Sequence, residues 1–205
     1  MTRSSDTALI VIDVQNDFCP GGALAVTGGD EVVPVINAML PTFETVIFTQ
    51  DWHPADHISF ASNHENAEPF ANIDLPYGRQ TLWPAHCVQG GSGAEFHVEL
   101  DTSRAQVVVR KGFRSDVDSY SAFFENDRQT VTGLHGYLSN RGIGSVVMAG
   151  LATDYCVAWS ALDAARLGLD TKVVLDGCRA IDLDGSLTKQ IDAMRHAGVK
   201  VVDSL

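Results

Sequence analysis

Six short apolar segments rich in β-branched residues are distributed along the chain. Each is almost continuously apolar and lacks the alternation of a strand with one face in solvent, a pattern typical of strands buried on both faces. These segments therefore predict a parallel sheet with helices packed on both faces. They span Thr7–Val14, Thr45–Thr49, Gln106–Arg110, Ser145–Ala149, Thr171–Leu175 and Val199–Val202.

The stretches between the apolar segments carry helical patterns with recognisable ends. Asp30 is suited to cap a helix that stops at Pro41, and Thr153 is suited to cap one that ends at Gly168. This alternation predicts an α/β fold, a three-layer αβα sandwich of the doubly wound kind, with a six-stranded, mostly parallel sheet. Two further helices are predicted over 131–140 and 184–197.

One long stretch departs from this rhythm. From Trp52 to about Arg104 the chain is rich in His, Pro, Asn, Gly and aromatic residues without sustained periodicity. About fifty such residues within a compact domain are more often functional than idle. The length of 205 residues, 45% of them hydrophobic, suits one continuous core. We predict a single domain over 1–205 with a long loop insertion at about 52–104.

Composition excludes two classes of partner. The chain has 14 basic and 26 acidic residues, and its net charge of -12 repels nucleic-acid phosphates and anionic lipids. No apolar run is long enough to cross a bilayer, and the polar first residues precede no signal-peptide segment. We therefore expect a cytoplasmic protein that binds neither nucleic acid nor membrane. Its oligomeric state stays open, with a homo-oligomer as one possibility.

Reactive side chains stand where four of the predicted strands end. Asp13 ends the first strand and Asp51 follows the second, while Lys111 and Cys156 follow the third and the fourth. Ligands of open α/β sheets bind beyond the carboxyl ends of the strands. The sequence thus predicts two carboxylates, an ammonium group and a thiol at one rim of the sheet.

Cys156 is the candidate nucleophile. The four cysteines contain no C-x-x-C pair, so neither a disulfide framework nor an all-thiolate zinc site is indicated. In the first turn of a helix capped by Thr153, the helix dipole is expected to lower the pKa of the Cys156 thiol below its usual value of about 8.5. The backbone N–H groups of Ala152 and Cys156 are candidates for an oxyanion hole. The alternative is an inert buried cysteine.

Asp13 and Lys111 supply what a thiol nucleophile needs. A carboxylate near the thiol can take its proton and later pass it to a leaving amine, while an ammonium group holds both anions in place. The alternatives are a turn-capping aspartate and a solvated lysine. Both are weakened because an acid directly after an apolar strand lies at a buried rim, where an unpaired charge is costly.

A metal site is predicted from a second cluster. Asp51 and His53 are two residues apart at a strand end and so face the same side, His86 is the chosen third ligand, and His57 is a weaker fourth candidate. Imidazole and carboxylate ligands suit one divalent metal ion, with zinc as first choice and iron or manganese as alternatives. The competing interpretation is that these histidines only order the long loop.

Aromatic side chains near these motifs suggest a pocket for a planar ring. Phe18 and Trp83 lie close to a catalytic and a metal motif, respectively, and are placed to stack on a flat heteroaromatic substrate. Tyr120 is a third candidate for substrate contact. Each alone could equally belong to the core.

Together these motifs resemble the nicotinamidase/pyrazinamidase branch of the isochorismatase-like cysteine hydrolases. The resemblance extends over nearly the whole chain. Its strings are Val11-Ile12-Asp13-Val14-Gln15-Asn16-Asp17-Phe18, Asp51-Trp52-His53-Pro54, Leu82-Trp83-Pro84-Ala85-His86-Cys87-Val88-Gln89, Lys111-Gly112-Phe113, Asp118-Ser119-Tyr120-Ser121-Ala122-Phe123 and Gly150-Leu151-Ala152-Thr153-Asp154-Tyr155-Cys156-Val157.

The resemblance implies a metal-dependent amidase that hydrolyses nicotinamide, and by extension pyrazinamide, to the acid and ammonia through a thioester in NAD salvage. It implies a catalytic triad of Asp13, Lys111 and Cys156 and a metal ion bound by Asp51, His53 and His86. It also implies an oxyanion hole formed by Ala152 and Cys156, and a cis peptide bond between Leu151 and Ala152. His57 lies inside the metal shell in some members only, and Tyr155 stands where some relatives carry histidine.

Two other functions remain open at this point. One is another hydrolase of the same fold, acting on a carbamoyl amide or a vinyl ether, although such an enzyme would not need His53 and His86. The other is a non-catalytic, zinc-stabilised binding protein, since fold alone does not imply catalysis. Replacing Cys156 by alanine would leave the function of a binding protein intact.

Overall fold

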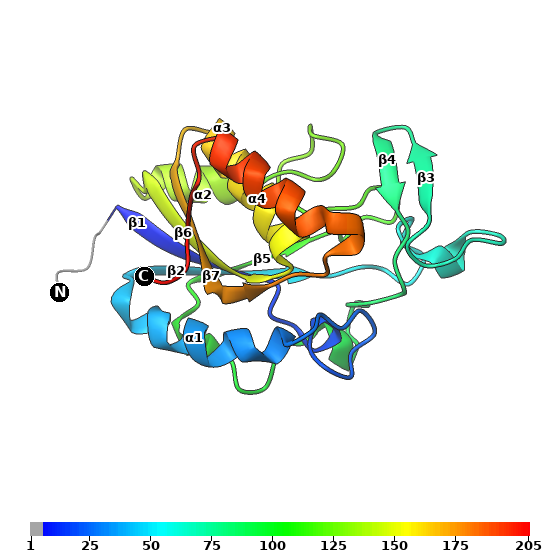
Figure 1. The fold of residues 1–205 in the computed structure, drawn as a ribbon, viewed down its shortest axis with the longest axis horizontal. Coiled ribbons are helices and arrows are strands. Elements are labelled where there is room, and N and C mark those ends of the chain that lie inside the picture. The colour runs from blue at the N-terminus through cyan, green and yellow to red at the C-terminus, as the bar shows by residue number, and fades with distance from the viewer. Residues whose placement is uncertain (1–5) are drawn as a thin grey trace.

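A parallel sheet forms the centre of the molecule. The computed structural model describes residues 6–205, and within them six strands form one sheet in the order β5-β2-β1-β6-β7-β8, every pairing parallel (Figure 1). The predicted six-stranded sheet is confirmed. The strands are β1 (Thr7–Ile12), β2 (Thr45–Asp51), β5 (Val107–Lys111), β6 (Ser145–Leu151), β7 (Asp170–Arg179) and β8 (Lys200–Val202).

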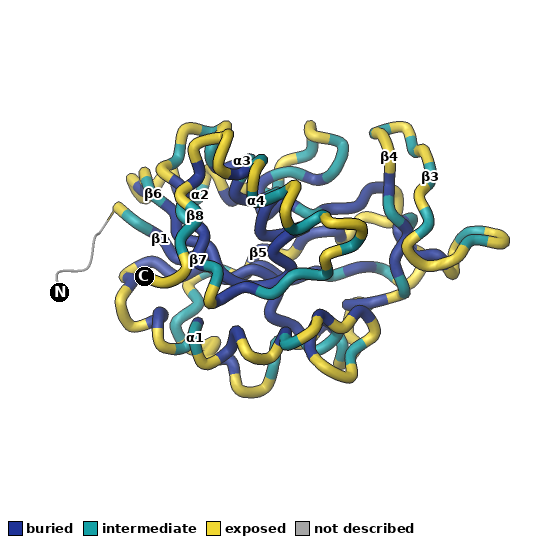
Figure 2. Tube along the Cα trace, viewed as in Figure 1, coloured by how far each residue is buried: buried dark blue, intermediate teal, exposed yellow. Residues whose placement is uncertain are grey.

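Helices cover both faces of this sheet, as predicted for an αβα sandwich. Helix α1 packs on one face against β6 and β7, and the other three helices lie on the opposite face (Figure 1). The central strands are buried between these layers (Figure 2), and all seven residues of β2 are buried. The helices are α1 (Val32–Met39), α2 (Leu134–Asn140), α3 (Ala158–Arg166) and α4 (Ser186–His196).

The apolar face of α1 shows why these segments fold as they do. Val32, Val33, Ile36 and Met39 recur at helical spacing and are all buried. Burying one such side chain contributes about 1.5–3 kcal/mol. Packing against the sheet, rather than helix propensity, therefore holds this short helix in place.

Two predicted helix caps are wrong. Asp30 lies inside a 3-10 turn, Gly29–Glu31, which follows the left-handed Gly28, so it lacks the extended backbone that a capping residue needs. Thr153 lies inside a π-helical turn, Thr153–Val157, that connects β6 to α3. There the carbonyl of Ala152 accepts hydrogen bonds from the backbone N–H groups of the turn, and no side chain caps it.

The segment predicted as a long loop contains a small hairpin. Strands β3 (Asn72–Leu75) and β4 (Gly78–Thr81) pair antiparallel and lie apart from the main sheet (Figure 1). β4 contains no apolar residue, so the sequence has no alternation there that would indicate a strand. The remainder of 52–104 consists of loops and 3-10 turns.

The strand order brings the predicted reactive residues together. Strands β5, β2, β1 and β6 are consecutive neighbours, and their carboxyl ends carry Lys111, Asp51, Asp13 and the turn with Cys156, respectively. Asp51 is the register partner of Lys111 across β2 and β5. Connections leave β1 and β6 in opposite directions, which opens a crevice at this edge of the sheet.

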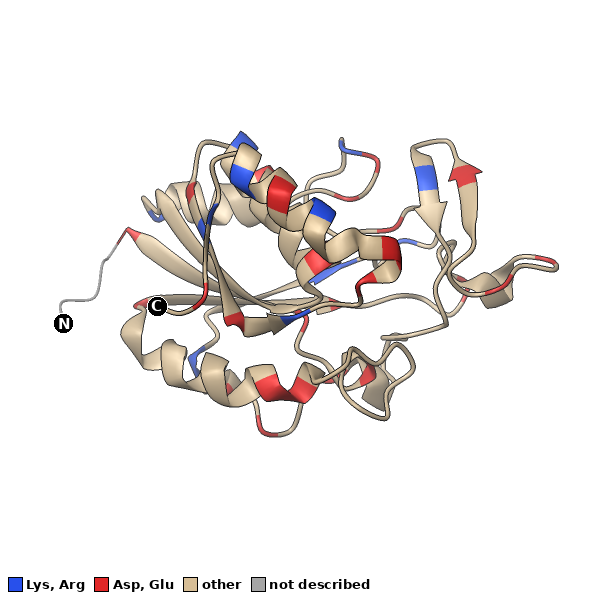
Figure 3. Ribbon diagram, in the orientation of Figure 1, with Lys and Arg blue, Asp and Glu red and all other residues tan. Residues whose placement is uncertain are grey.

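Charge is spread widely over the outside of the fold. Acidic residues occur on the loops, on β3 and on α4, interspersed with fewer basic ones (Figure 3). Among residues 6–205, none of the helices has the length and apolarity required to span a bilayer.

Candidate active site

The carboxylate of Asp13 is held by a neighbouring strand. Thr49 on β2 donates a hydrogen bond from Oγ1 to Asp13 Oδ1 at 2.6 Å, and the backbone N–H of Asp13 donates to the same hydroxyl oxygen at 3.2 Å. Both side chains are fully buried. Oδ2 of Asp13 is left to face the site. No sequence pattern pointed to Thr49, although its position two residues before Asp51 places it at the same strand end.

Lys111 is the centre of the cluster. Its Nζ lies 2.8 Å from Asp13 Oδ2 and 3.4 Å from Cys156 Sγ. It also donates to Asp51 Oδ1, and to the backbone oxygen of Ser119 at 3.1 Å. Oxygen atoms of Asp13 and Asp51 and the sulfur of Cys156 all lie within 4.8 Å of one another. The predicted acid, ammonium group and thiol therefore meet in one buried cluster.

Burial and charge set the protonation states of this cluster. Burial raises the pKa of Asp13 to about 6, against the lowering effect of the Lys111 ammonium group. Burial alone would lower the pKa of Lys111, but the carboxylates of Asp13 and Asp51 raise it well above its ordinary value. Lys111 is thus a permanent cation, while Asp13 is a carboxylate poised near neutral pH.

The expectation of a low pKa for Cys156 is wrong. Burial raises the pKa of this thiol well above its ordinary value, and the nearby Lys111 only partly opposes that effect. Cys156 belongs to the π-helical turn rather than to the first turn of α3. The thiol is therefore protonated at rest, and its activation requires a proton acceptor. The predicted cis peptide between Leu151 and Ala152 is present.

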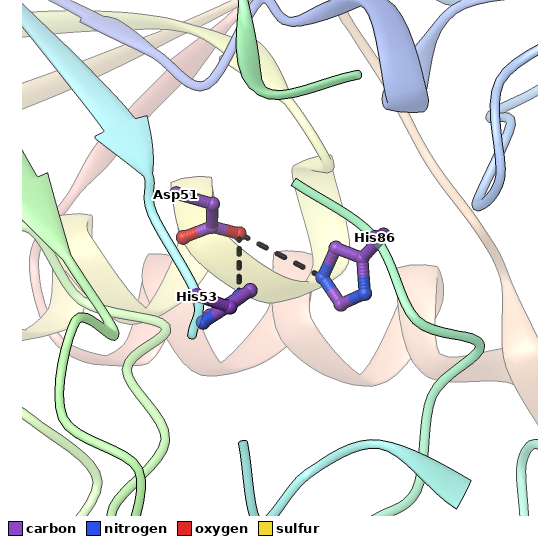
Figure 4. A group of neighbouring side chains, drawn as sticks. All are labelled: Asp51, His53 and His86. Atoms are coloured by element: carbon purple, nitrogen blue, oxygen red, sulfur yellow. Dashed lines mark ion pairs between the residues drawn. The ribbon is translucent and has the colours of Figure 1, made fainter. Parts of the chain in front are cut away.

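Asp51, His53 and His86 converge from two segments (Figure 4). Asp51 Oδ2 lies 3.7 Å from His53 Nε2 and 4.0 Å from His86 Nε2. Nδ1 of His53 lies 2.8 Å from the carbonyl oxygen of Gly112, and Nδ1 of His86 lies 2.8 Å from that of Pro84. Each carbonyl accepts the Nδ1 proton and leaves an Nε2 lone pair facing Asp51, the arrangement that metal-binding histidines require.

The charges of Asp51 and His86 also fit a metal site, whereas the carboxylate of Asp51 raises the pKa of His53 although burial opposes it. Lys111 and His53 lower the pKa of Asp51 below its usual range although burial opposes them. Burial lowers the pKa of His86 to about 4, so its imidazole is neutral at neutral pH. An ionised carboxylate and a neutral imidazole are the forms that bind divalent metal ions. The donor set therefore fits a metal ion.

His57 is placed beside this group rather than in it. Its ring lies 4.2 Å from that of His53, centroid to centroid. Its Nδ1 is 2.7 Å from Ser59 Oγ and its Nε2 is 3.2 Å from the carbonyl oxygen of Val117. Both nitrogens are thus occupied by the protein.

One pocket joins the two clusters. Phe18, Trp83 and Tyr120, predicted to contact substrate, line it together with Cys156 and Ala152. The indole N–H of Trp83 donates to Tyr120 Oη at 3.1 Å, which fixes two of these rings relative to each other. Leu24 and Ile181 also line it, and no motif pointed to them because their positions follow from packing. Asp118 and Tyr155, which stood in the motif strings without an assigned role, line it too.

Comparison with known proteins identifies this arrangement. A family model described as the isochorismatase domain matches residues 7–204. The chain belongs to the isochorismatase family. The resemblance predicted from the motifs is thereby confirmed, and the αβα fold is the one that this isochorismatase family shares.

Relatives place the chain more narrowly within the isochorismatase family. The nicotinamidase of Acinetobacter baylyi is 54% identical over 100% of this chain and 95% of the relative. The structure of an Acinetobacter baumanii nicotinamidase/pyrazinamidase superposes with a TM-score of 0.97 at 52% identity, covering 98% of this chain and 97% of that one. A Pyrococcus horikoshii pyrazinamidase in complex with zinc has a TM-score of 0.78 at 34% identity, covering 96% and 98%.

Proposed function

We propose that this isochorismatase-family protein is a nicotinamidase, which hydrolyses nicotinamide to nicotinate and ammonia with Cys156 as nucleophile. One observation carries the proposal: Lys111 contacts the Asp13 carboxylate and the Cys156 thiol at the base of a cavity lined by aromatic rings. The nicotinamidase relatives, similar over the full chain, support the choice of substrate.

The cavity suits the flat ring of this substrate. Phe18 and Trp83 supply apolar faces for the ring, and Tyr120 completes the wall. Asp51, His53 and His86 would hold a divalent metal ion, with zinc preferred because a pyrazinamidase relative is a zinc complex. Such an ion would supply a Lewis-acid position for the pyridine nitrogen and so orient the ring. His57 stays outside this set.

Formation of the thioester begins with a proton transfer. Asp13 takes the proton of the Cys156 thiol, and the sulfur attacks the carboxamide carbon. Lys111 lies against both groups and stabilises the negative charge as it passes from the Asp13 carboxylate to the Cys156 sulfur. The backbone N–H groups of Ala152 and Cys156 are the proposed donors to the oxyanion that forms. Asp13 then returns its proton to the leaving amide nitrogen, and ammonia departs.

Hydrolysis of the thioester uses the same groups in reverse. Asp13, again a carboxylate, takes a proton from water, whose oxygen attacks the thioester carbonyl. The carbon–sulfur bond breaks and the sulfur of Cys156 recovers the proton held by Asp13. Nicotinic acid leaves and ionises to nicotinate. One water is consumed for each ammonia released. Pyrazinamide, whose ring has the same size, is proposed as a second substrate, and recycling of nicotinamide into NAD as the role.

Turnover of nicotinamide by the metal-loaded protein tests this proposal. Nicotinate and ammonia are measured together for the wild type, Cys156→Ala and the control Cys178→Ala, a buried cysteine outside the cavity. We expect equimolar products from the wild type and the control and none from Cys156→Ala. Undiminished turnover by Cys156→Ala would contradict the mechanism.

The metal is tested separately. Treatment with a chelator should abolish turnover, and adding back zinc, iron or manganese in turn identifies the ion that restores it. His53→Ala should lose both bound metal and activity. His135→Ala, which alters an exposed histidine on α2, should lose neither. Full activity of the metal-free protein would remove the metal from the proposal.

A further inference from the structure

The β3–β4 hairpin contains one buried side chain. Gln80, which is 1% exposed, is the only buried residue among Asn72–Leu75 and Gly78–Thr81, and the rest of this hairpin is largely open to solvent (Figure 2). Burying an amide is costly unless its donors and acceptor find partners. A glutamine in this position therefore needs a reason beyond the hairpin itself.

The amide of Gln80 is fully engaged. Its Nε2 lies 2.7 Å from Asp118 Oδ2, 3.1 Å from Tyr120 Oη and 2.7 Å from its neighbour's backbone oxygen. Its Oε1 accepts hydrogen bonds from Tyr77 Oη at 3.2 Å and from Asn126 Nδ2 at 3.3 Å. Gln80 thus ties the hairpin to the loop that follows β5.

Two side chains that accept hydrogen bonds from Gln80 Nε2 line the cavity, although Gln80 itself does not. Asp118 and Tyr120 both line the cavity that contains Cys156. Tyr120 Oη also accepts the indole N–H of Trp83, so a continuous chain of hydrogen bonds runs from Gln80 through Tyr120 to Trp83. Trp83 in turn packs edge-on against Tyr155 at 4.9 Å between ring centroids.

We infer that Gln80 is a positioning residue that sets the aromatic wall of the cavity and thereby the choice of ring. This inference rests on the proposed function. Gln80 reaches the cavity through Asp118 and Tyr120 and makes no hydrogen bond to Asp13, Lys111 or Cys156. Selectivity for the ring should therefore change more than the rate of the chemical step.

Gln80→Met is the first test, because methionine matches glutamine in length but cannot make these hydrogen bonds. We expect the KM for nicotinamide to rise about tenfold while kcat changes by less than about threefold. The ratio of kcat/KM for nicotinamide over 5-methylnicotinamide should fall at least about threefold as the wall loosens. A ratio does not depend on how much of the protein is folded.

Two further variants complete the test. Tyr77→Phe removes the hydroxyl that donates to Gln80 Oε1 and accepts from the backbone N–H of Asp118, and it serves as the test if Gln80→Met does not fold. It should lower the same ratio to a smaller extent. Asn72→Ala is the matched control, since it removes the exposed hairpin contact with Thr81 and leaves Gln80 in place. The control should keep the wild-type ratio.

The outcomes separate this inference from the proposed function. The inference would be overturned if Gln80→Met and Tyr77→Phe both kept the wild-type KM and the wild-type ratio of kcat/KM for the two substrates. A lower kcat for both substrates would not change that conclusion. If the wild type does not hydrolyse nicotinamide, the proposed function fails, and the affinity for nicotinate measured by calorimetry tests the wall instead. Weaker nicotinate binding by Gln80→Met than by Asn72→Ala would support the inference, and equal binding would refute it.

Discussion

The ammonium group of Lys111 donates a hydrogen bond to Oδ1 of Asp51, a carboxylate whose other oxygen faces His53 and His86. The same ammonium group contacts Asp13 and Cys156. The sequence suggested two separate sites, one for the nucleophile and one for a metal ion. The structure shows that a single buried lysine joins them.

Removal of Lys111 should therefore destabilise the whole rim. Lys111→Met leaves Asp13 and Asp51 buried without their common cation, and such a loss costs about 3 kcal/mol or more. Urea unfolding measures the change. Lys200→Met breaks the exposed pair with Asp170 and should change the free energy of unfolding by less than about 0.5 kcal/mol. Equal stabilities of the two variants would show that the rim tolerates unpaired carboxylates.

Thr49 should matter for the rate of the reaction. Thr49→Val removes the hydrogen bond that orients Asp13 Oδ1 while keeping the shape of the side chain. We expect kcat for nicotinamide to fall about tenfold or more, because a proton acceptor works only when it is held in place. Thr49→Ser retains the hydroxyl and should recover most of the rate. Equal rates for the valine and serine variants would speak against this role.

Gly112 should be essential for the metal site. Its φ of +62° is unfavourable for other residues, and an added Cβ would overlap the ring of His53. Gly112→Ala should lose bound metal, as measured by elemental analysis after dialysis. Gly136 on α2 has open space around it, so Gly136→Ala should keep the metal and gain up to about 1 kcal/mol of stability. Full metal content in Gly112→Ala would contradict the placement of His53.

Glu125 should make stability depend on pH. Burial raises its pKa from an ordinary value of 4.5 to about 7, although Arg114 at 2.8 Å opposes this. Between these two values the folded protein holds a proton that the unfolded chain has released, so stability falls as the pH rises through this window.

The comparison of wild type with Glu125→Gln isolates this effect. The glutamine variant lacks the titrating group, so its stability should fall less between pH 5 and pH 8, by on the order of 1–2 kcal/mol once solvent screening near the exposed Arg114 is allowed for. Urea unfolding at both pH values measures it. Identical pH profiles would show that Glu125 titrates near its ordinary pKa.

Much of the site was predictable because of the kind of sheet that the chain forms. Strands buried on both faces read as continuous apolar runs, and their carboxyl ends meet at one edge, so a charged residue directly after each run lies at the site. Asp13, Asp51 and Lys111 were placed at the site by this reasoning, and Cys156 by its position in the segment that follows the fourth run. His53 and His86 were chosen by ligand chemistry and spacing.

The sequence by itself thus determined the layers of the fold, the strand ends and the types of reactive group. Tertiary structure alone decided that Lys111 joins Asp13 to Asp51, that Cys156 is a protonated thiol in a π-helical turn, and that Gln80 supports the cavity wall. The physical reason is that a hydrogen bond or a pKa depends on distance and burial. These are set by segments far apart in the chain, whereas strands, helices and turns leave their patterns in neighbouring residues.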